Sequence, residues 1–278
     1  RISITDETAF EVGRNVAVSE GAVVFENDLF QLLQYAPLTA QVAARPLLIV
    51  PPCINKFYIL DLQPENSFVR FACEQGHTVF LVSWRNPGEE QRHITWDGYL
   101  SQGAMRAIEV AREISGADKV NALGWCVGGT ILASALAVLR AKGDKSVASL
   151  TLLTTMLDFT DPGDLGVFID EQGVSQREQT IGSGGIYPGA QLGFVFQTLR
   201  ANDLIWPYVI NNYLKGKSPD AFDLLYWNAD ATNLPGPMYA WYLRNMYLEN
   251  NLRVPNKLAM CGTPVDLGKI DLPSFVLA

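Results

Sequence analysis

Two spacings of apolar side chains organise the first half of the chain. Residues 8–37 alternate apolar and polar positions between turn-forming residues, which predicts an antiparallel meander. Short, continuous apolar runs follow, and such runs are typical of strands that are buried on both faces of a sheet. The predicted strands are residues 46–50, 78–84, 120–123 and 147–154.

Helices are predicted between these strands. Residues 67–75 form one helix that ends at Gly76, and residues 96–115 place apolar side chains at helical spacing before Gly116. A third helix starts after residues 124–129 and extends to about Lys142. Because strands and helices alternate in this order, we expect a parallel sheet with helices on both faces.

One strand–turn–helix junction carries the clearest chemical signal. Residues 124–129 read Gly-Trp-Cys-Val-Gly-Gly, which is the Gly-x-nucleophile-x-Gly pattern of a nucleophile elbow with cysteine at the nucleophile position. Side chains two residues before or after the nucleophile would collide with the neighbouring helix and strand. We expect Cys126 to be the nucleophile, with its thiolate favoured at a helix N-terminus, and the Val127 N–H to donate to an oxyanion. The alternative is a glycine-rich turn with a structural cysteine.

The pattern changes between residues 161 and 262, where glycine and proline interrupt it and aromatic residues become frequent. We expect a mostly helical insertion that covers the nucleophile. Most of its aromatic side chains would form the insertion's own core, and a minority would line an acyl channel. These aromatic residues are Phe194, Phe196, Trp206, Tyr208, Tyr213, Tyr226, Trp227, Tyr239, Trp241, Tyr242 and Tyr247.

Together these features predict an α/β-hydrolase fold with a mostly helical cap insertion. Residues 1–160 would form the first part of the core with the elbow, residues 161–262 the cap, and residues 263–278 the return to the core sheet. In this fold a second oxyanion donor comes from the loop after the strand that ends at Val50. The prolines of that loop lack an N–H, so the amides of Cys53 and Ile54 are the first candidates, with Ile54 as the possible second donor. We expect the Cys53 side chain to be packed.

The base and acid of a catalytic triad are not evident in the chain. Both histidines, His77 and His93, precede Cys126, whereas this fold orders its triad as nucleophile, acid and histidine. We therefore expect both to be structural or surface residues, and Asp61 and Asp97 to cap helices or order loops. Residues 274–278 read as a buried strand, and the chain starts at Arg1 without methionine. We expect both ends to be cut, with the catalytic Asp and His beyond residue 278.

Composition narrows the class of protein. A chain of 278 residues that is 48% hydrophobic can bury a large core. Its net charge of −8 and the lack of a basic stripe argue against nucleic acid as a partner. The four cysteines lack disulfide or metal spacing, so we expect a reducing compartment, no metal and no cofactor. We find no signal peptide and no membrane span in the sequence. For Arg85 two roles stay open, binding of a phosphate or a surface salt bridge.

Several sequence blocks point to one family. Besides the elbow, they are Pro-Pro-Cys-Ile-Asn-Lys-Phe-Tyr-Ile-Leu-Asp-Leu, Val-Ser-Trp-Arg-Asn-Pro, Leu-Leu-Tyr-Trp-Asn-Ala-Asp-Ala-Thr-Asn-Leu-Pro-Gly-Pro and Cys-Gly-Thr-Pro-Val-Asp-Leu. In this order and spacing, the chain resembles the catalytic domain of class I polyhydroxyalkanoate (PHA) synthases over essentially its whole length. Cys126 falls on the family's nucleophile.

The resemblance implies polymerisation of (R)-3-hydroxyacyl-CoA, typically 3-hydroxybutyryl-CoA, into a polyester with release of CoA. It implies a Cys-His-Asp triad, the growing PHA chain as a partner, a homodimer, and a cytoplasmic location at the surface of PHA granules. An N-terminal domain of the family would precede Arg1. Two alternatives stay open: a cysteine-dependent acyl-CoA thioesterase or hydrolase of the same fold, and a binding protein in which Cys126 is structural.

Overall fold

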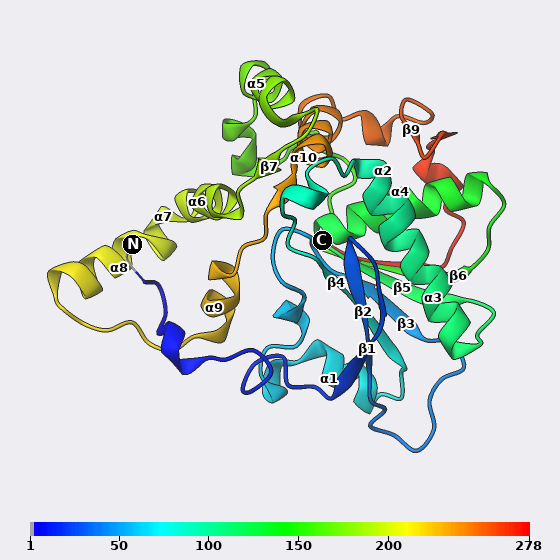
Figure 1. The fold of residues 1–278 in the computed structure, drawn as a ribbon, viewed down its shortest axis with the longest axis horizontal. Helices are drawn as coiled ribbons and strands as arrows, with labels where there is room; N and C mark the ends of the chain where they lie inside the picture. The colour runs from blue at the N-terminus through cyan, green and yellow to red at the C-terminus, as the bar shows by residue number, and fades with distance from the viewer. Residues whose placement is uncertain (1–2) are drawn as a thin grey trace.

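A twisted sheet forms the centre of the computed structural model, which describes residues 3–278 (Figure 1). Its strand order is β1-β2-β4-β3-β5-β6-β11. Strands β4, β3, β5, β6 and β11 run parallel, whereas β1 and β2 pair antiparallel. The predicted parallel α/β sheet is thereby confirmed. The bounds are β1 (Gly21–Glu26), β2 (Phe30–Tyr35), β3 (Leu47–Val50), β4 (Val79–Trp84), β5 (Val120–Trp125), β6 (Val147–Leu153) and β11 (Ser274–Leu277).

Helices cover both faces of the sheet, as predicted. Leu48 and Val50 of β3 belong to the apolar cluster that includes the buried side chains of α3 and α4. Ile49, between them, belongs to the cluster on the opposite face with α1. The alternation follows from the pleat of a strand, which points successive side chains to opposite faces. The helices are α1 (Phe68–Glu74), α2 (Trp96–Gly98), α3 (Arg106–Ser115) and α4 (Val127–Ala141), and a π-helical segment (Tyr99–Met105) joins α2 to α3.

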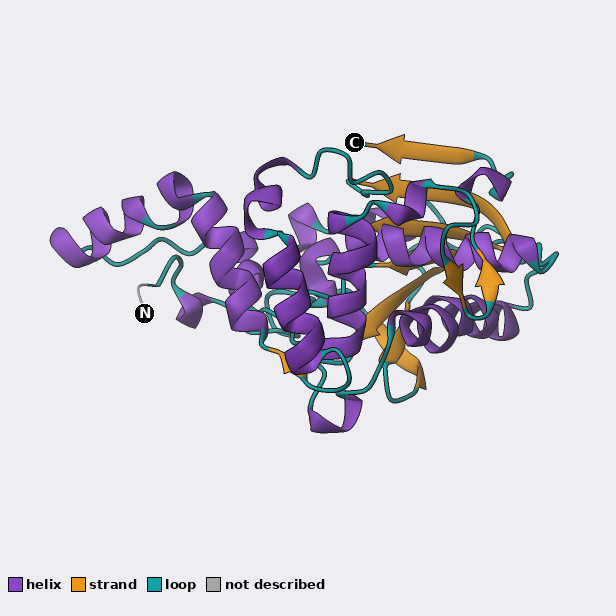
Figure 2. Ribbon diagram, turned by 90° about the horizontal axis from the view of Figure 1, so that it is seen from above, coloured by secondary structure: helices purple, strands orange, loops and turns teal. Residues whose placement is uncertain are grey.

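Residues 161–262 are mostly helical, in agreement with the prediction for this segment, and the carboxyl ends of the parallel strands face these helices (Figure 2). Its helices are α5 (Glu171–Ile181), α6 (Gly189–Leu199), α7 (Ala201–Leu204), α8 (Trp206–Tyr208), α9 (Asp223–Ala229) and α10 (Gly236–Tyr242). Short strand pairs are β7 (Ile186–Tyr187) with β8 (Leu234–Pro235), and β9 (Ala259–Met260) with β10 (Thr263–Pro264). Along residues 3–278 no helix combines the length and apolar character needed to cross a bilayer.

The interpretation of residues 274–278 as a buried strand was wrong. β11 pairs with β6 at the edge of the sheet, but its side chains are exposed: Phe275 by 61%, Val276 by 60% and Leu277 by 53%. An edge strand has a neighbour on one side only, and within the described residues no helix covers either face of this one. The apolar run correctly indicated a strand but not its burial.

A buried carboxylate joins the start of α9 to the core. Asp223, only 3% exposed, accepts hydrogen bonds from Gln63 Nε2 at 2.9 Å, Asn66 Nδ2 at 2.8 Å and the Leu224 N–H at 2.7 Å. Burial alone would raise the pKa of this carboxyl, but the three donors outweigh it and hold the pKa below its usual value. The charged form therefore stabilises the contact between the helical segment and the core.

Replacing Asp223 tests this contact. We expect Asp223→Ala to lower the free energy of unfolding by about 2 kcal/mol at pH 7, because a buried carboxylate that accepts three hydrogen bonds is lost. Asp203→Ala, which removes an exposed ion pair with Arg200, should cost less than about 1 kcal/mol. Since the folded-state pKa of Asp223 is lowered, the difference between wild type and Asp223→Ala should shrink as the pH falls below about 4. Urea titrations at several pH values measure it, and a difference independent of pH would contradict the account.

Candidate active site

Cys126 lies at the turn between β5 and α4, in the elbow that the sequence predicts. Its backbone has a φ of 51° and a ψ of −130°, a conformation that a residue with a side chain rarely adopts. The strain is held from both sides, because the Cys126 N–H donates to Leu153 O at 2.9 Å and Cys126 O accepts from the Gly129 N–H at 2.9 Å. The turn is therefore a fixed part of the fold.

The glycines around Cys126 are required by close backbone packing. A Cβ at Gly124 would overlap Gly129 Cα, and one at Gly128 would overlap the carbonyl oxygens of Val50 and Pro51. These are the collisions that the sequence pattern predicts for positions two residues before and after the nucleophile. The close approach sets the turn beside the loop that follows β3.

Cys126 borders an apolar cavity of about 180 Å³. The core contributes Ile54, Cys126 and Val127, and all other lining residues belong to the helical segment. Its side chains there are mostly aliphatic or aromatic, including Tyr187, Tyr239, Tyr242 and Tyr247. A minority of the aromatic residues thus lines a cavity next to Cys126, and its use as an acyl channel stays a prediction. No group of three or more His, Cys, Asp or Glu side chains in residues 3–278 is placed to hold a metal.

Two backbone amides lie beside this cavity. Val127 is the first residue of α4, and its N–H has no helical acceptor and lies close enough to the thiol to act on its pKa. Ile54 O accepts from the Thr232 N–H at 2.9 Å, while the Ile54 N–H is not hydrogen-bonded to any described residue. The Trp84 indole donates to Pro51 O at 2.8 Å and fixes the start of the same loop. Both amides are therefore available to a ligand, and their role as oxyanion donors remains a prediction.

The Cys126 thiol is half-buried, and burial raises its pKa, an effect that the Val127 N–H only partly offsets. The expected stabilisation of the thiolate by the helix N-terminus is thus outweighed by the apolar cavity. A base is required for Cys126 to act as a nucleophile at neutral pH. Cys53 is 1% exposed and burial raises its pKa to about 12, so it is a packed thiol, as expected.

Neither described histidine is placed to be that base. His77 precedes β4 and thus lies at the amino end of the parallel strands, opposite Cys126. His93 is exposed, and its Nδ1 lies 3.2 Å from Ser183 O.

The remaining polar candidates have structural contacts. Asp61 is buried and accepts from Ser67 Oγ at 2.6 Å and Ser19 Oγ at 2.5 Å, so it orders a loop, as predicted. Asp97 lies in the first turn of α2. Arg85 pairs with Glu26 at 3.2 Å in an exposed salt bridge.

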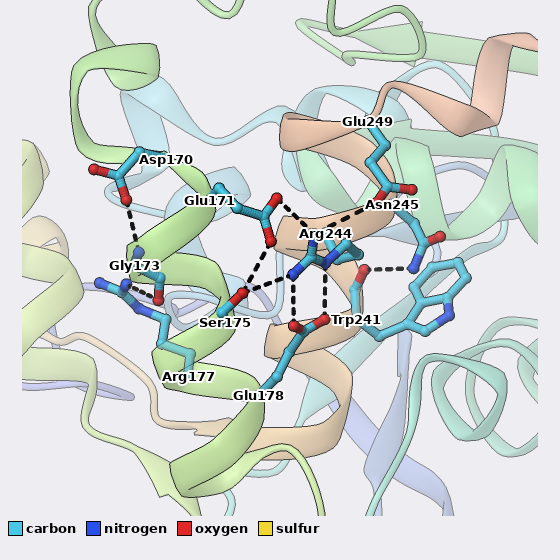
Figure 3. A network of polar contacts seen from close by, with 10 residues as sticks. All are labelled: Asp170, Glu171, Gly173, Ser175, Arg177, Glu178, Trp241, Arg244, Asn245 and Glu249. Carbon is cyan, nitrogen blue, oxygen red and sulfur yellow. Dashed lines mark hydrogen bonds and ion pairs between the residues drawn. The ribbon is translucent and has the colours of Figure 1, made fainter.

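Arg244 links two helical elements that both contribute residues to the cavity lining, and Figure 3 shows its contacts with α5. It belongs to the π-helical segment Leu243–Leu248 and pairs with Glu178 at 2.7 Å and Glu171 at 2.9 Å. Its Nη2 also contacts Ser175 Oγ at 3.2 Å, so one guanidinium holds three positions of α5. The neighbouring carboxylates raise the pKa of Arg244, which therefore remains charged.

Sequence reasoning missed Arg177, the one charged side chain among the described residues that line the cavity. It also did not single out Arg244. Helical spacing was the one sequence signal that could have placed Arg177 in the cavity wall, since Val174 and Arg177 are three residues apart and share a face of α5. Nothing in the local sequence distinguished this arginine from a solvated one.

Alanine at Gly128 tests the packing of the elbow. We expect Gly128→Ala to destabilise the protein by about 3 kcal/mol or more, because the new Cβ would overlap two backbone carbonyls that cannot move independently. Gly193→Ala in α6 is a matched control, since its nearest neighbour would be Ala231 Cβ at 4.0 Å. Thermal unfolding measures both. Equal stability of the two variants would contradict the geometry described.

Two family models match the chain. The model described as the N-terminus of poly-beta-hydroxybutyrate polymerase matches residues 1–72, and the alpha/beta hydrolase fold matches residues 46–278. Among solved structures, a putative lipase from Sulfolobus solfataricus has a TM-score of 0.53 at 13% identity and covers 93% of this chain and 90% of its own. A hydrolase from Pseudomonas aeruginosa PA01 has a TM-score of 0.50 at 14% identity, and the match covers 92% of this chain and 78% of the hydrolase. These two structures support the fold alone.

Curated relatives are more similar to this chain in sequence than these two structures are. The poly(3-hydroxyalkanoate) polymerase subunit PhaC of Cupriavidus necator is 64% identical over 99% of this chain and 48% of its own length. The poly(3-hydroxyalkanoate) polymerase of Methylorubrum extorquens is 48% identical over 100% of this chain and 46% of its own length. The chain spans about half the length of these relatives. It belongs to the alpha/beta-hydrolase fold family and, within it, is homologous to the poly(3-hydroxyalkanoate) polymerases.

Proposed function

We propose that this chain is the part of a poly(3-hydroxyalkanoate) polymerase that carries the nucleophile. The polymerase joins (R)-3-hydroxyacyl units from CoA thioesters, typically 3-hydroxybutyryl-CoA, into a polyester. The observation that carries the proposal is the Cys126 thiol, held in a strained elbow at the wall of an apolar cavity beside two available amides. The names of the relatives supply the class of substrate.

The proposed acylation uses Cys126 as a covalent nucleophile. The thiolate sulfur attacks the thioester carbonyl, and the Val127 and Ile54 N–H groups stabilise the resulting oxyanion. The tetrahedral intermediate collapses as the carbon–sulfur bond to CoA breaks, and CoA leaves as the thiol with the proton that the base took from Cys126. Because a thioester is exchanged for a thioester, this step loses little free energy.

Chain growth then requires an alcohol as the second nucleophile. The 3-hydroxyl of another hydroxyacyl unit loses its proton to a base and attacks the acyl carbon on Cys126, so an ester bond forms and the Cys126 sulfur is released. We propose that a His oriented by an Asp, both beyond residue 278, is the base for both steps. The raised pKa of Cys126 supports the need for it, and so do the positions of His77 and His93.

The apolar cavity favours polymerisation over hydrolysis by limiting water at the acyl-enzyme. It is the feature that separates this proposal from the alternative, a thioesterase of the same fold. We further propose a homodimer at the surface of cytoplasmic PHA granules. Large exposed apolar side chains in the helical segment, among them Phe194, Trp206 and Tyr213, support such contacts.

The test uses the full-length polypeptide incubated with (R)-3-hydroxybutyryl-CoA, alongside Cys126→Ala. We expect wild type to release CoA and form an insoluble polyester, and Cys126→Ala to lose at least about a thousandfold in rate, since triad members act as a unit. CoA release is followed with a thiol reagent, and the product by chromatography. Free hydroxy acid as the sole product would favour the thioesterase, and no release at all would favour a binding protein.

A further inference from the structure

Arg177 is a cation in the wall of an otherwise apolar cavity. Its Nη1 donates to Gly173 O of the same helix at 2.8 Å, and its Cζ lies 5.9 Å from the centre of the Tyr187 ring. In the part of the chain that the structure describes, it forms no ion pair with a carboxylate, in contrast to Arg244 on the adjacent helical segment. A guanidinium has five N–H donors, so most of them remain available to a ligand.

The contacts of α5 hold Arg177 in this position. Glu171, Ser175 and Glu178 form one face of the helix and bind Arg244. Figure 3 shows Arg177 on another side of α5, away from that cluster. Val174, one turn earlier, lines the same cavity. Arg177 thus lies on a different side of the helix from the residues that bind Arg244, and it is oriented before a ligand arrives.

The size and lining of the cavity restrict its occupant. An apolar cavity of about 150 Å³ accommodates a molecule of about the size of benzene. The cavity here is about 180 Å³, which suits a short acyl segment and excludes a nucleotide. Apart from Arg177, its lining side chains are uncharged. The Tyr187 ring lies beside the guanidinium, and the Tyr239 ring is tilted by 30° against it with ring centres 4.3 Å apart. A ligand with neutral oxygen acceptors fits these surroundings better than a phosphate does.

We propose that Arg177 binds an ester carbonyl of the polyester chain attached to Cys126. The thioester carbonyl would be held by the Val127 and Ile54 amides, so the donors of Arg177 are left for the next carbonyl along the chain. A single hydroxyacyl group on Cys126 lacks that second carbonyl. Arg177 is thus a substrate-binding residue that distinguishes a growing chain from a first unit, and this role rests on the proposed function.

The test compares two substrates with the full-length polypeptide: CoA thioesters of one and of three (R)-3-hydroxybutyrate units. Thiol release in the first turnover is measured for wild type, Arg177→Gln and Arg177→Lys. We expect the ratio of the three-unit rate to the one-unit rate to fall about tenfold in Arg177→Gln, equal to about 1.4 kcal/mol, and to recover partly in Arg177→Lys. Arg45→Gln is the control, because Arg45 precedes β3 at the amino end of the parallel strands, opposite the Cys126 turn, and pairs with exposed Asp118.

Each other outcome overturns the assignment in a recognisable way. An equal loss for both substrates in Arg177→Gln, with unfolding unchanged, would show that the second carbonyl is not the ligand. A loss that disappears when pantetheine thioesters replace CoA thioesters would assign Arg177 to the phosphates of CoA instead. If wild type releases no thiol from either substrate, the proposed function itself fails, and the role of Arg177 fails with it.

Discussion

The candidate site depends on one backbone constraint, the positive-φ conformation of Cys126 at a junction with no room for further side chains. A φ of 51° is strained for cysteine, and it persists because β5, β6 and α4 meet at this point. Gly128 lets the start of α4 approach the end of β3, and Gly124 lets it approach β5. The same approach brings the Val127 amide beside the loop that carries Ile54, so the thiol and both amides share one cavity. Packing of the sheet thus determines the geometry of the Cys126 turn.

In the proposed function, burial of Cys126 accounts for both the exclusion of water and the need for a base. The apolar cavity that would keep water from an acyl-enzyme also raises the pKa of the Cys126 thiol. The helix N-terminus alone does not offset the raised pKa, so a further group has to remove the proton from the thiol. The side chains of the helical segment form most of the cavity wall, and Arg244 fixes α5 within that wall. The proposed function therefore assigns this segment a part in the chemistry.

Local patterns predicted much of this arrangement, and tertiary contacts determined the rest. The elbow was predictable because its glycines and the flanking apolar strand lie within a short stretch of sequence, and the strand assignments rested on equally local runs. The burial of β11 was predicted wrongly, since an apolar run indicates a strand but not what covers it. The direction of the Cys126 pKa and the place of Arg177 in the cavity depend on residues far away in sequence, so no local pattern could reveal them.

The central claim is that Cys126 forms a covalent thioester with the hydroxyacyl group. The most direct measurement is peptide mapping by mass spectrometry, after the full-length polypeptide has been mixed briefly with (R)-3-hydroxybutyryl-CoA and quenched in acid. The account predicts an added hydroxybutyryl mass on the peptide that contains Cys126 and on none that contains Cys53, Cys73 or Cys261. An adduct on another cysteine, or turnover with no adduct on any peptide, would contradict it.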